Sequence, residues 1–362
     1  MLFPYGNNIK LHIEGGSHDE KIELLLKGFP KGIHIDEENL ALFMARRAPG
    51  RNEWSTSRKE ADSPVFLSGI ENGITTGEDI RAVIYNQNQH SSDYSDMGKI
   101  PRPSHADFCA IMKYGKNTDL RGGGHYSGRL TALTCTAGFL AMEYLKEKGI
   151  EIFSHIYSIS DINDIPFDME NVGKNEREIL KNASFPVLDS ALGEKMKEKI
   201  KEAKERLDSV GGIIECAVTG LPVGLGEHLF AGAEARISSA MFSIPAVKGI
   251  EFGNGFRGTL LYGSENNDPF YFDDNDAVRT RGNNSGGILG GMTNGMPIVF
   301  RVAVKPTPSI GIEQDTVDLS EKTNIRYKIK GRHDPCIVPR AVPVTEAAAA
   351  LAVLDMLLDE VK

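Results

Sequence analysis

The stretch Arg102-Pro103-Ser104-His105-Ala106-Asp107 is followed closely by Leu120-Arg121-Gly122-Gly123-Gly124-His125-Tyr126-Ser127-Gly128-Arg129, and we expect the fold to be organised around the pair. Together they place arginines, histidines and three consecutive glycines before a long apolar segment. Glycine lets backbone N–H groups approach a phosphate, arginine offers a planar fork of donors, and histidine can move a proton near neutral pH. The pair therefore predicts a site for a small anion with acid–base chemistry beside it.

Two pieces from the ends of the chain are expected to join this site. One is Gly15-Gly16-Ser17-His18, and the other is Gly331-Arg332-His333-Asp334-Pro335-Cys336. A tight turn between strands explains the glycines of the first piece equally well. A histidine such as His18, taken alone, is more often a surface or hydrogen-bonded core residue than a catalyst.

Composition is typical of a globular protein and predicts neither a membrane span nor a metal site. Of 362 residues, 40% are apolar and 25% are charged, and no run of eighteen apolar residues occurs. The first residues lack a basic region followed by an apolar core, so we expect no secretory signal. The cysteines show no Cys-x-x-Cys pairing, and we expect reduced cytosolic thiols that mostly fill the core: Cys109, Cys135, Cys216 and Cys336.

The net charge of −9 disfavours a general nucleic-acid binder, which normally presents a basic face. Positive charge is nevertheless clustered, at Arg46, Arg47, Arg51, Arg58, Arg102, Arg121 and Arg129. For Arg46 and Arg47, complementing a helix dipole is an alternative explanation. A local basic pocket in an acidic protein favours a small anionic ligand over a polymer.

Hydrophobic periodicity predicts a mixed helix and strand protein. Strands are expected at 8–13, 20–27, 65–70, 81–85, 151–160, 211–218, 246–253 and 297–304. Helices are expected from Asp36 to Pro49-Gly50 and at 130–148, 189–210, 225–242 and 345–358.

Two further segments are predicted to be irregular. Residues 86–101 form a polar loop of a length that is usually functional or mobile, and its closure over a ligand is a hypothesis. Residues 281–295 contain six glycines and are expected to form no regular element. They are either a floppy loop or a backbone cradle for a bulky ligand, anchored by Ile288, Leu289 and Met292.

A series of short motifs carries a family resemblance over nearly the whole chain. They are Gly-x-Ser-His ending at His18, Arg102–Asp107, Arg121–Gly124, Pro245–Gly249, Asn283–Gly291, Lys305–Thr307 and Gly331–Cys336. None is specific alone, but in this order they resemble the chorismate synthase family. The resemblance implies a phosphate lyase that converts 5-enolpyruvylshikimate 3-phosphate to chorismate by anti 1,4-elimination. Reduced FMN would be the cofactor, without net redox change, and NADPH is a candidate flavin reductant.

The same resemblance implies a single α+β domain over residues 1–362, in which a helical layer lies between antiparallel sheets in a β-α-β sandwich. It further implies a cytoplasmic homotetramer that binds the small-molecule substrate and neither nucleic acid nor membrane.

Site residues carry over by resemblance, position by position. His18 matches the family histidine near the leaving phosphate, His105 the histidine near the flavin pyrimidine edge, and Asp334 the aspartate near flavin N5 that helps relay the substrate proton. Substrate-binding positions are Ser17, Arg47, Arg51, Arg102 and Arg129. Flavin-contact positions are His125, Tyr126, Ser127, Ala246, Gly290, Lys305, Pro306, Thr307, Pro308, Ser309 and Arg332.

These assignments agree with the chemistry of the residues. A substrate with one phosphate and two carboxylates needs several arginines in a desolvated site. A protonated histidine assists a departing phosphate, and a cationic His105 would stabilise negative charge near flavin N1.

Several positions depart from the family pattern. The usual Gly-Glu-Ser-His-Gly has Gly16 and Asp19 in place of its glutamate and last glycine. The usual Gly-Arg-Ser-Ser-Ala-Arg-Glu-Thr reads GHYSGRLT at 124–131, which loses an arginine and introduces Tyr126, an aromatic that could stack on a flavin. Glu53 stands where an arginine is expected, and Arg51 is expected to take its place. We interpret the chain as a divergent but active member.

Two other classes of function fit the sequence less well. A flavin-binding paralogue without elimination activity, acting as a carrier or regulatory subunit, is the alternative. A nucleotide-using kinase is disfavoured, because the chain has no Gly-x-x-x-x-Gly-Lys-Ser/Thr motif.

Overall fold

A computed structural model describes residues 5–50, 62–86, 99–115, 118–181, 183–329 and 334–359. Arg51, Glu53, Arg58, Arg332 and most of the predicted 86–101 loop lie outside these ranges. The mixed helix and strand content expected from the sequence is confirmed, and the strands form two antiparallel sheets with several small hairpins.

The first sheet has the strand order β1-β2-β6-β3. Its strands are β1 (Lys10–Glu14), β2 (Lys21–Lys27), β6 (Ile80–Tyr85) and β3 (Val65–Ser68). Side chains of β2 alternate between buried and partly exposed, because successive residues of a strand point to opposite faces. One face of this sheet is therefore packed into the core.

The second sheet has the strand order β10-β15-β9-β7-β8. Its strands are β10 (Val247–Phe252), β15 (Ile298–Val304), β9 (Gly212–Thr219), β7 (Glu151–Ile159) and β8 (Ile162–Asn163). The central strands β7, β9 and β15 carry nearly continuous buried runs, as expected when both faces of a sheet are covered.

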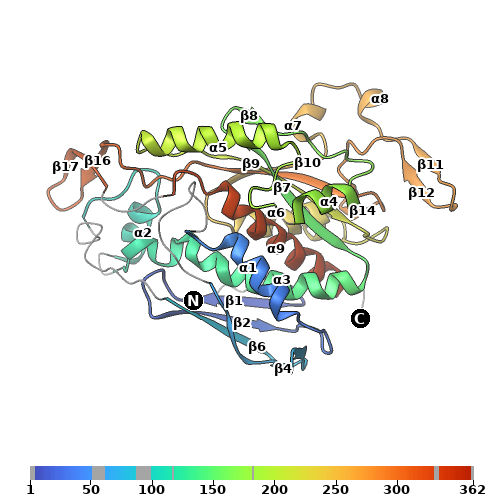
Figure 1. The fold of residues 1–362 in the computed structure, drawn as a ribbon, viewed down its shortest axis with the longest axis horizontal. Coiled ribbons are helices and arrows are strands. Elements are labelled where there is room, and N and C mark those ends of the chain that lie inside the picture. Colours follow the sequence, from blue (N-terminus) through green and yellow to red (C-terminus); the bar gives the residue numbers. More distant parts are fainter. Residues whose placement is uncertain are drawn as a thin grey trace.

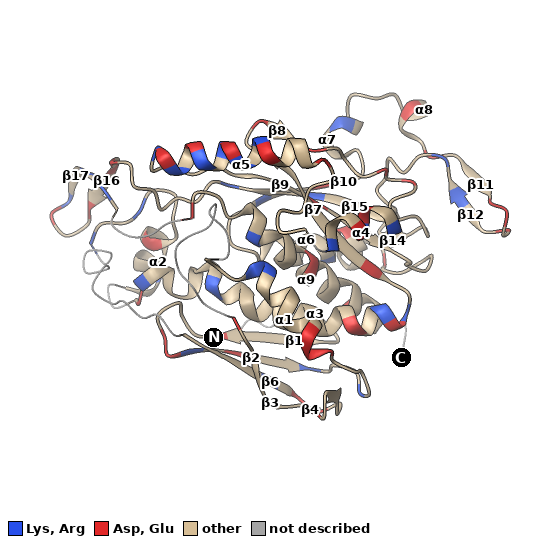
Figure 2. Ribbon diagram, in the orientation of Figure 1, with Lys and Arg blue, Asp and Glu red and all other residues tan. Residues whose placement is uncertain are grey.

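Four helices lie between these sheets in Figure 1: α1 (Glu37–Arg47), α3 (Thr131–Glu147), α6 (Ala233–Phe242) and α9 (Val338–Leu357). Helix α9 contacts α3, α6, β7 and β9, and α3 also contacts β2. A Cβ added at Gly138 of α3 would come within 2.3 Å of the Ala347 Cβ, so small residues allow α3 and α9 to pack closely. Figure 2 shows few charges on α3 and α9 but many on α5 (Ser190–Glu205), which covers the outer side of β7.

Three predicted helix boundaries are wrong. Helix α5 ends at Glu205, and Leu207 is exposed beyond it. Helix α6 begins at Ala233 rather than 225, because the preceding segment turns through Gly226, at φ +97. Helix α9 begins at Val338 rather than 345, with prolines at its second and sixth positions. A proline in the first turn is tolerated, since that turn's N–H groups have no partner within the helix.

The glycine-rich segment 281–295 is more regular than expected. It contains a short hairpin of β13 (Ile288–Leu289) and β14 (Met292–Thr293) around Gly290 and Gly291. Ile288 is buried and anchors the hairpin, whereas Leu289 and Met292 are partly exposed. The prediction that no regular element forms here is therefore wrong.

Several small elements had not been predicted. They are α2 (Asp107–Tyr114), α4 (Lys174–Lys181), α7 (Gly255–Gly258), α8 (Gly263–Asn266) and the paired strands β4 (Ile70–Glu71) with β5 (Ile74–Thr75), β11 (Phe270–Phe272) with β12 (Val278–Thr280), and β16 (Gln314–Asp318) with β17 (Thr323–Tyr327).

The cysteines are free thiols, with Cys135, Cys216 and Cys336 buried and Cys109 exposed. Among the described residues, no helix is both long and apolar enough to cross a membrane.

Candidate active site

The run Gly122–Gly124 forms the centre of the candidate site. All three glycines have positive φ, at 59°, 112° and 52°. A Cβ added at Gly122 would lie 2.5 Å from the His18 Nε2, and one at Gly123 would lie 3.7 Å from the His105 Nε2. The run thus needs glycine for its backbone conformation, and it brings two histidines that are distant in sequence to adjacent residues.

The N-terminal piece docks onto this run through hydrogen bonds. Ser17 Oγ donates to the Arg121 carbonyl at 2.9 Å, and the Ser17 N–H donates to the Gly124 carbonyl at 3.3 Å. His125 Nδ1 lies 2.7 Å from the Gly15 carbonyl. Gly15 has φ +105, so the tight-turn explanation of the glycines also holds. His18 is buried here, at 5% exposure.

Asp19, one of the departures from the family pattern, stabilises its own turn. Its carboxylate accepts from the Gly16 N–H at 2.6 Å. Its carbonyl accepts from the Asn86 side chain, and Asn86 Oδ1 in turn accepts from Arg129 Nε at 3.0 Å. The Ser17–His18 turn is therefore tied to the arginine region of the site.

The Arg102–Asp107 turn holds His105 through a buried carboxylate. Asp107 Oδ1 lies 2.6 Å from His105 Nδ1, and Asp107 also accepts from Arg102 Nε at 2.6 Å and from Arg102 Nη2 at 2.7 Å. Burial would raise the pKa of Asp107, but hydrogen bonds from Arg102 and His105 outweigh it and hold that pKa well below its usual value. Asp107 is fully buried.

The Lys305–Ser309 segment packs against the same turn. Ser309 Oγ accepts from Arg102 Nη1 at 3.2 Å, and Lys305 Nζ donates to the Ser104 carbonyl at 2.6 Å. The Lys305 N–H donates to the Ala246 carbonyl at 3.0 Å, and Ala246 has a positive φ of 74°. Burial, and secondarily Lys248, lower the pKa of Lys305. Two predicted flavin-contact segments therefore adjoin His105.

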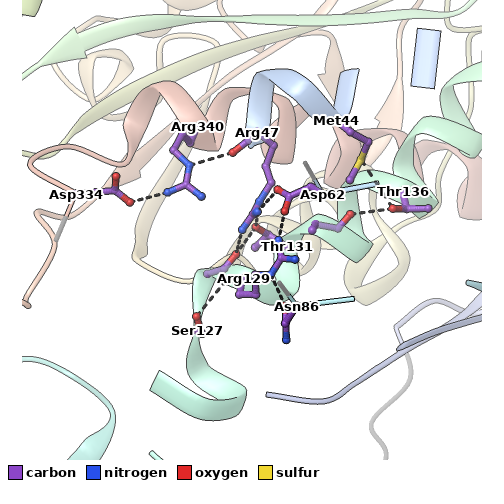
Figure 3. Close-up of polar contacts among 12 residues, drawn as sticks. Met44, Arg47, Asp62, Asn86, Ser127, Arg129, Thr131, Thr136, Asp334 and Arg340 are labelled. Carbon is purple, nitrogen blue, oxygen red and sulfur yellow. Dashed lines mark hydrogen bonds and ion pairs between the residues drawn. The ribbon is translucent and has the colours of Figure 1, made fainter. Parts of the chain in front are cut away.

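An arginine cluster lies at the other end of the glycine-rich run (Figure 3). The buried Asp62 carboxylate pairs with both Arg47 and Arg129. Arg47 also donates to the Gly128 carbonyl at 2.7 Å and to Thr131 Oγ1 at 3.3 Å. Arg47 and Arg129 are each less than a tenth exposed, so this cluster concentrates positive charge where water screens it weakly.

Asp334 reaches this cluster through an arginine (Figure 3). Arg340 Nη1 donates to Asp334 Oδ2 at 2.6 Å, and Arg340 Nε donates to the Arg47 carbonyl at 3.0 Å. Asp334, in the described part of the C-terminal piece, is thus linked to the arginine cluster through Arg340, as the sequence predicted for this piece.

A cavity of about 250 Å³ adjoins the site. His125, Ser127 and Thr131 line one side, and Ser243 and Pro245 line another. His18, His105 and Asp334 are not among its walls. The cavity connects the 125–127 segment with the chain just before Ala246, so it lies beside two flavin-contact positions.

The remaining predicted residues are more scattered. Tyr126 is 38% exposed, Pro306 is exposed and Pro308 is partly buried. Gly290 belongs to the β13–β14 hairpin, whose Gly291 carbonyl accepts from the Ala233 N–H at the start of α6 at 2.7 Å, and Figure 1 shows β14 well apart from α2. Arg51 and Arg332 lie outside the described residues.

Two arginines from the sequence clusters serve elsewhere. Arg46 forms a paired hydrogen bond with the buried Glu346, and Arg121 pairs with Asp119 at the surface. Neither the helix-dipole explanation for Arg46 nor the anion-binding expectation for Arg121 predicted these carboxylate partners.

Sequence reasoning missed Asp62 and Arg340 and gave no role to Asp107. Asp62 is a lone acid after an irregular segment, and Arg340 lies within an apolar helix, so neither shows a pattern. Asp107 could have been recognised, because a carboxylate two residues after His105 is close enough in sequence to bond to its imidazole.

Comparisons with known proteins agree on one family. The family model described as chorismate synthase matches residues 9–358. A chorismate synthase of Agathobacter rectalis is 44% identical over 98% of this chain and 94% of its own, and one of Korarchaeum cryptofilum is 42% identical over 98% and 97%. A solved structure described as a crystal structure of chorismate synthase superposes with a TM-score of 0.78 at 28% identity, covering 98% of this chain and 93% of the other.

Proposed function

This chain belongs to the chorismate synthase family, the phosphate lyases of the shikimate pathway, and we propose that its reaction takes place at the site built on Gly122–Gly124. The reaction is the anti 1,4-elimination of phosphate from 5-enolpyruvylshikimate 3-phosphate to give chorismate. The observation that carries this location is the contact of His18 with Gly122 and of His105 with Gly123, next to a buried arginine cluster.

His18 is proposed to donate a proton to the leaving phosphate. It is 5% exposed and adjoins Ser17, whose hydroxyl is anchored to the Arg121 carbonyl. In such a weakly screened position a protonated imidazole stabilises a departing anion more strongly than it would in water.

Arg47 and Arg129 are proposed to bind the substrate's anionic groups. Both guanidinium groups already pair with the buried Asp62 carboxylate, so a bound substrate anion would share these donors with Asp62 or displace it. Asp334 is proposed to receive the substrate proton, with Arg340 fixing its position at 2.6 Å. Arg102 is held in the same way as Arg47, because its donors are directed at Asp107 and Ser309.

Residues near His105 fit a flavin mononucleotide. The buried Thr307 hydroxyl has no hydrogen-bond partner within the described part of the chain, and Lys305 places a positive charge at the Ser104 carbonyl, next to His105 in the sequence. His125 and Ser127 would contact the flavin across the cavity from Pro245. Reduced FMN, when bound, supplies transient electron density to the eliminating substrate. The protein's residues orient both molecules and exclude water.

The β-α-β sandwich, a single domain over 1–362, a homotetramer and a cytoplasmic location are further parts of this proposal. The helices between the two sheets in Figure 1 support the sandwich, and the continuous contacts of α9 with both α3 and β7 support one domain. The flavin reductant, NADPH or another, is left to measurement.

The test is an anaerobic reaction of purified protein with photoreduced FMN and 5-enolpyruvylshikimate 3-phosphate. Chorismate absorbance and phosphate release should appear together in equal amounts. An Arg129→Lys variant should bind substrate more weakly, because lysine cannot offer the same forked donors. Phosphate release without chorismate would contradict the proposed elimination.

A further inference from the structure

We propose that Asp107 and Arg102 fix His105 in the tautomer that carries its proton on Nδ1, so that His105 exchanges protons through Nε2. This makes Asp107 and Arg102 positioning residues for His105. The tautomer follows from the geometry alone, whereas its use in turnover rests on the proposed function.

The first step concerns the two neighbours of Nδ1. Asp107 Oδ1 lies 2.6 Å from Nδ1, and Arg102 Nη2 lies 3.1 Å from it. A guanidinium can only donate, and one N–H of Nη2 is directed at Asp107 Oδ1 at 2.7 Å. Its second N–H could reach a bare Nδ1 only over the longer 3.1 Å, whereas the carboxylate oxygen lies at 2.6 Å. A bare nitrogen at Nδ1 would place its lone pair against a carboxylate oxygen. A proton on Nδ1 instead completes a short, charge-assisted hydrogen bond.

The second step concerns the charge of Asp107. Three donors from Arg102 reach the carboxylate: Nε at 2.6 Å, Nη2 at 2.7 Å and the backbone N–H at 3.1 Å. Because Asp107 is fully buried, these contacts also replace its lost hydration. Asp107 therefore remains an acceptor throughout the neutral range.

The third step concerns the direction of Nε2. An ideal Cβ on Gly123 would lie 3.7 Å from both Nε2 and Cε1, so this edge of the ring faces the glycine run. The side chain of His105 is 15% exposed, and His18 contacts the next glycine of the run. Lys305 is the charged group on the other side of the turn, held to the Ser104 carbonyl.

Proton balance is simple in this arrangement. A cationic His105 releases the proton on Nε2 to an anionic group bound at the glycine run and becomes the neutral Nδ1–H imidazole. The hydrogen bond to Asp107 persists in both states, so the ring does not have to turn between them.

The test is ¹⁵N NMR of the whole protein labelled only in histidine, without flavin or substrate. The His105 signals are identified by their loss in His105→Gln. Above the pKa of the ring, the account predicts a protonated Nδ1 and an unprotonated Nε2. A protonated Nε2 in the unaltered protein would overturn the proposal, and this measurement needs no variant of Asp107 to fold.

Asp107→Asn extends the test. The amide oxygen would take over the Arg102 donors, leaving the amide NH₂ facing Nδ1 and favouring the opposite tautomer. Turnover should fall by roughly 10²-fold or more, as expected for a misdirected proton donor. The matched control is Asp355→Asn. Asp355 is another buried aspartate paired with an arginine, Arg236 at 3.3 Å, and its replacement should leave the His105 signals unchanged.

The outcomes separate the inference from the proposed function. Unchanged His105 signals in folded Asp107→Asn would overturn the positioning role. The expected tautomer change with undiminished turnover would uphold that role and instead contradict the proposed use of His105 in the reaction.

Discussion

Two histidines in this molecule contact an aspartate through Nδ1, yet their surroundings suit opposite purposes. His155 of β7 is fully buried, with Nδ1 at 2.9 Å from Asp164 and Nε2 at 3.0 Å from Glu215. His105 has one such partner, Asp107, and turns its Nε2 edge to the glycine run. The difference lies at the second nitrogen, which faces a carboxylate in His155 and the glycine run in His105, and this contrast underlies the proposed proton exchange of His105.

The surroundings of His155 complete a structural network. Glu215 also accepts from Arg301 Nε at 2.8 Å and from the Phe167 N–H at 2.6 Å, and Asp164 accepts from two backbone N–H groups. Burial would lower the pKa of His155, but hydrogen bonds to Asp164 and Glu215 outweigh it and raise that pKa. This network joins β7, β9 and β15 to the segment that precedes α5.

The largest expected effect is on the His105 side. His105→Gln should lower turnover by roughly 10²–10⁴-fold, the range of general acid–base assistance. Its free energy of unfolding should change little, because glutamine can still hydrogen-bond to Asp107. Anaerobic turnover and urea unfolding of the same preparation measure both quantities. A large loss of stability would show that His105 belongs with His155 as a structural residue.

The converse substitution, His155→Gln, should reverse this pattern. Removing the cation leaves two buried carboxylates facing each other, which typically costs about 3–5 kcal/mol of unfolding free energy. Turnover per folded molecule should be retained, because His155 lies outside the candidate site. Urea unfolding followed by circular dichroism gives the first quantity, and an assay normalised to folded protein gives the second.

The glycine run provides a sharper test of the His18 contact. Gly122→Ala should cost about 1–2 kcal/mol for the positive φ and should also displace His18, lowering turnover by roughly tenfold or more. Gly149→Ala is the matched control, because Gly149 has φ +74 and open space around its Cβ position. The control should lose stability and keep its turnover. Equal turnover in both variants would contradict the contact.

The smallest expected effect is on how the unfolding free energy changes with pH. The folded pKa of His155 is raised above its ordinary value of 6.5, so its stabilising contribution is full below pH 6.5 and is lost as pH rises through the folded pKa. The unfolding free energy of wild type should therefore approach that of His155→Gln as pH rises above 6.5. Urea titrations at several pH values measure this. A difference that grows with pH would contradict the raised pKa.

The contribution of Asp107 to stability depends on pH with the opposite sign to that of His155. Because its folded pKa is lowered, its contribution is full above the ordinary value of 3.8 and is lost as pH falls through the folded pKa. Asp107→Asn should therefore flatten the acid side of the stability profile, while leaving the slope due to His155 above pH 6.5 in place.

The sequence could predict elements whose pattern is local. The strand at 20–27, the Asp36 cap of α1 and the apolar character of α3 are each contained within one segment, and the structure confirms all three. The motifs likewise named most of the residues that now surround the glycine run. Boundaries failed where glycine and proline contexts were ambiguous, as before α6 and at the start of α9.

Partnerships across the chain could not be predicted. Glu215 is 60 positions from His155, and Asp62 is 67 from Arg129, and no periodicity links such pairs. From the sequence, His155 is simply one residue of the strand expected at 151–160. The distinction between the two histidines therefore required the structure, because it depends on which carboxylates the fold brings to each nitrogen.

The most direct test of this distinction is a single-turnover reaction under anaerobic conditions. Wild type, His105→Gln and His155→Gln are each mixed with photoreduced FMN and limiting 5-enolpyruvylshikimate 3-phosphate, and chorismate formation is followed by absorbance. The account predicts that folded His155→Gln matches wild type, while His105→Gln is at least about 10²-fold slower. Equal rates for wild type and His105→Gln would contradict it.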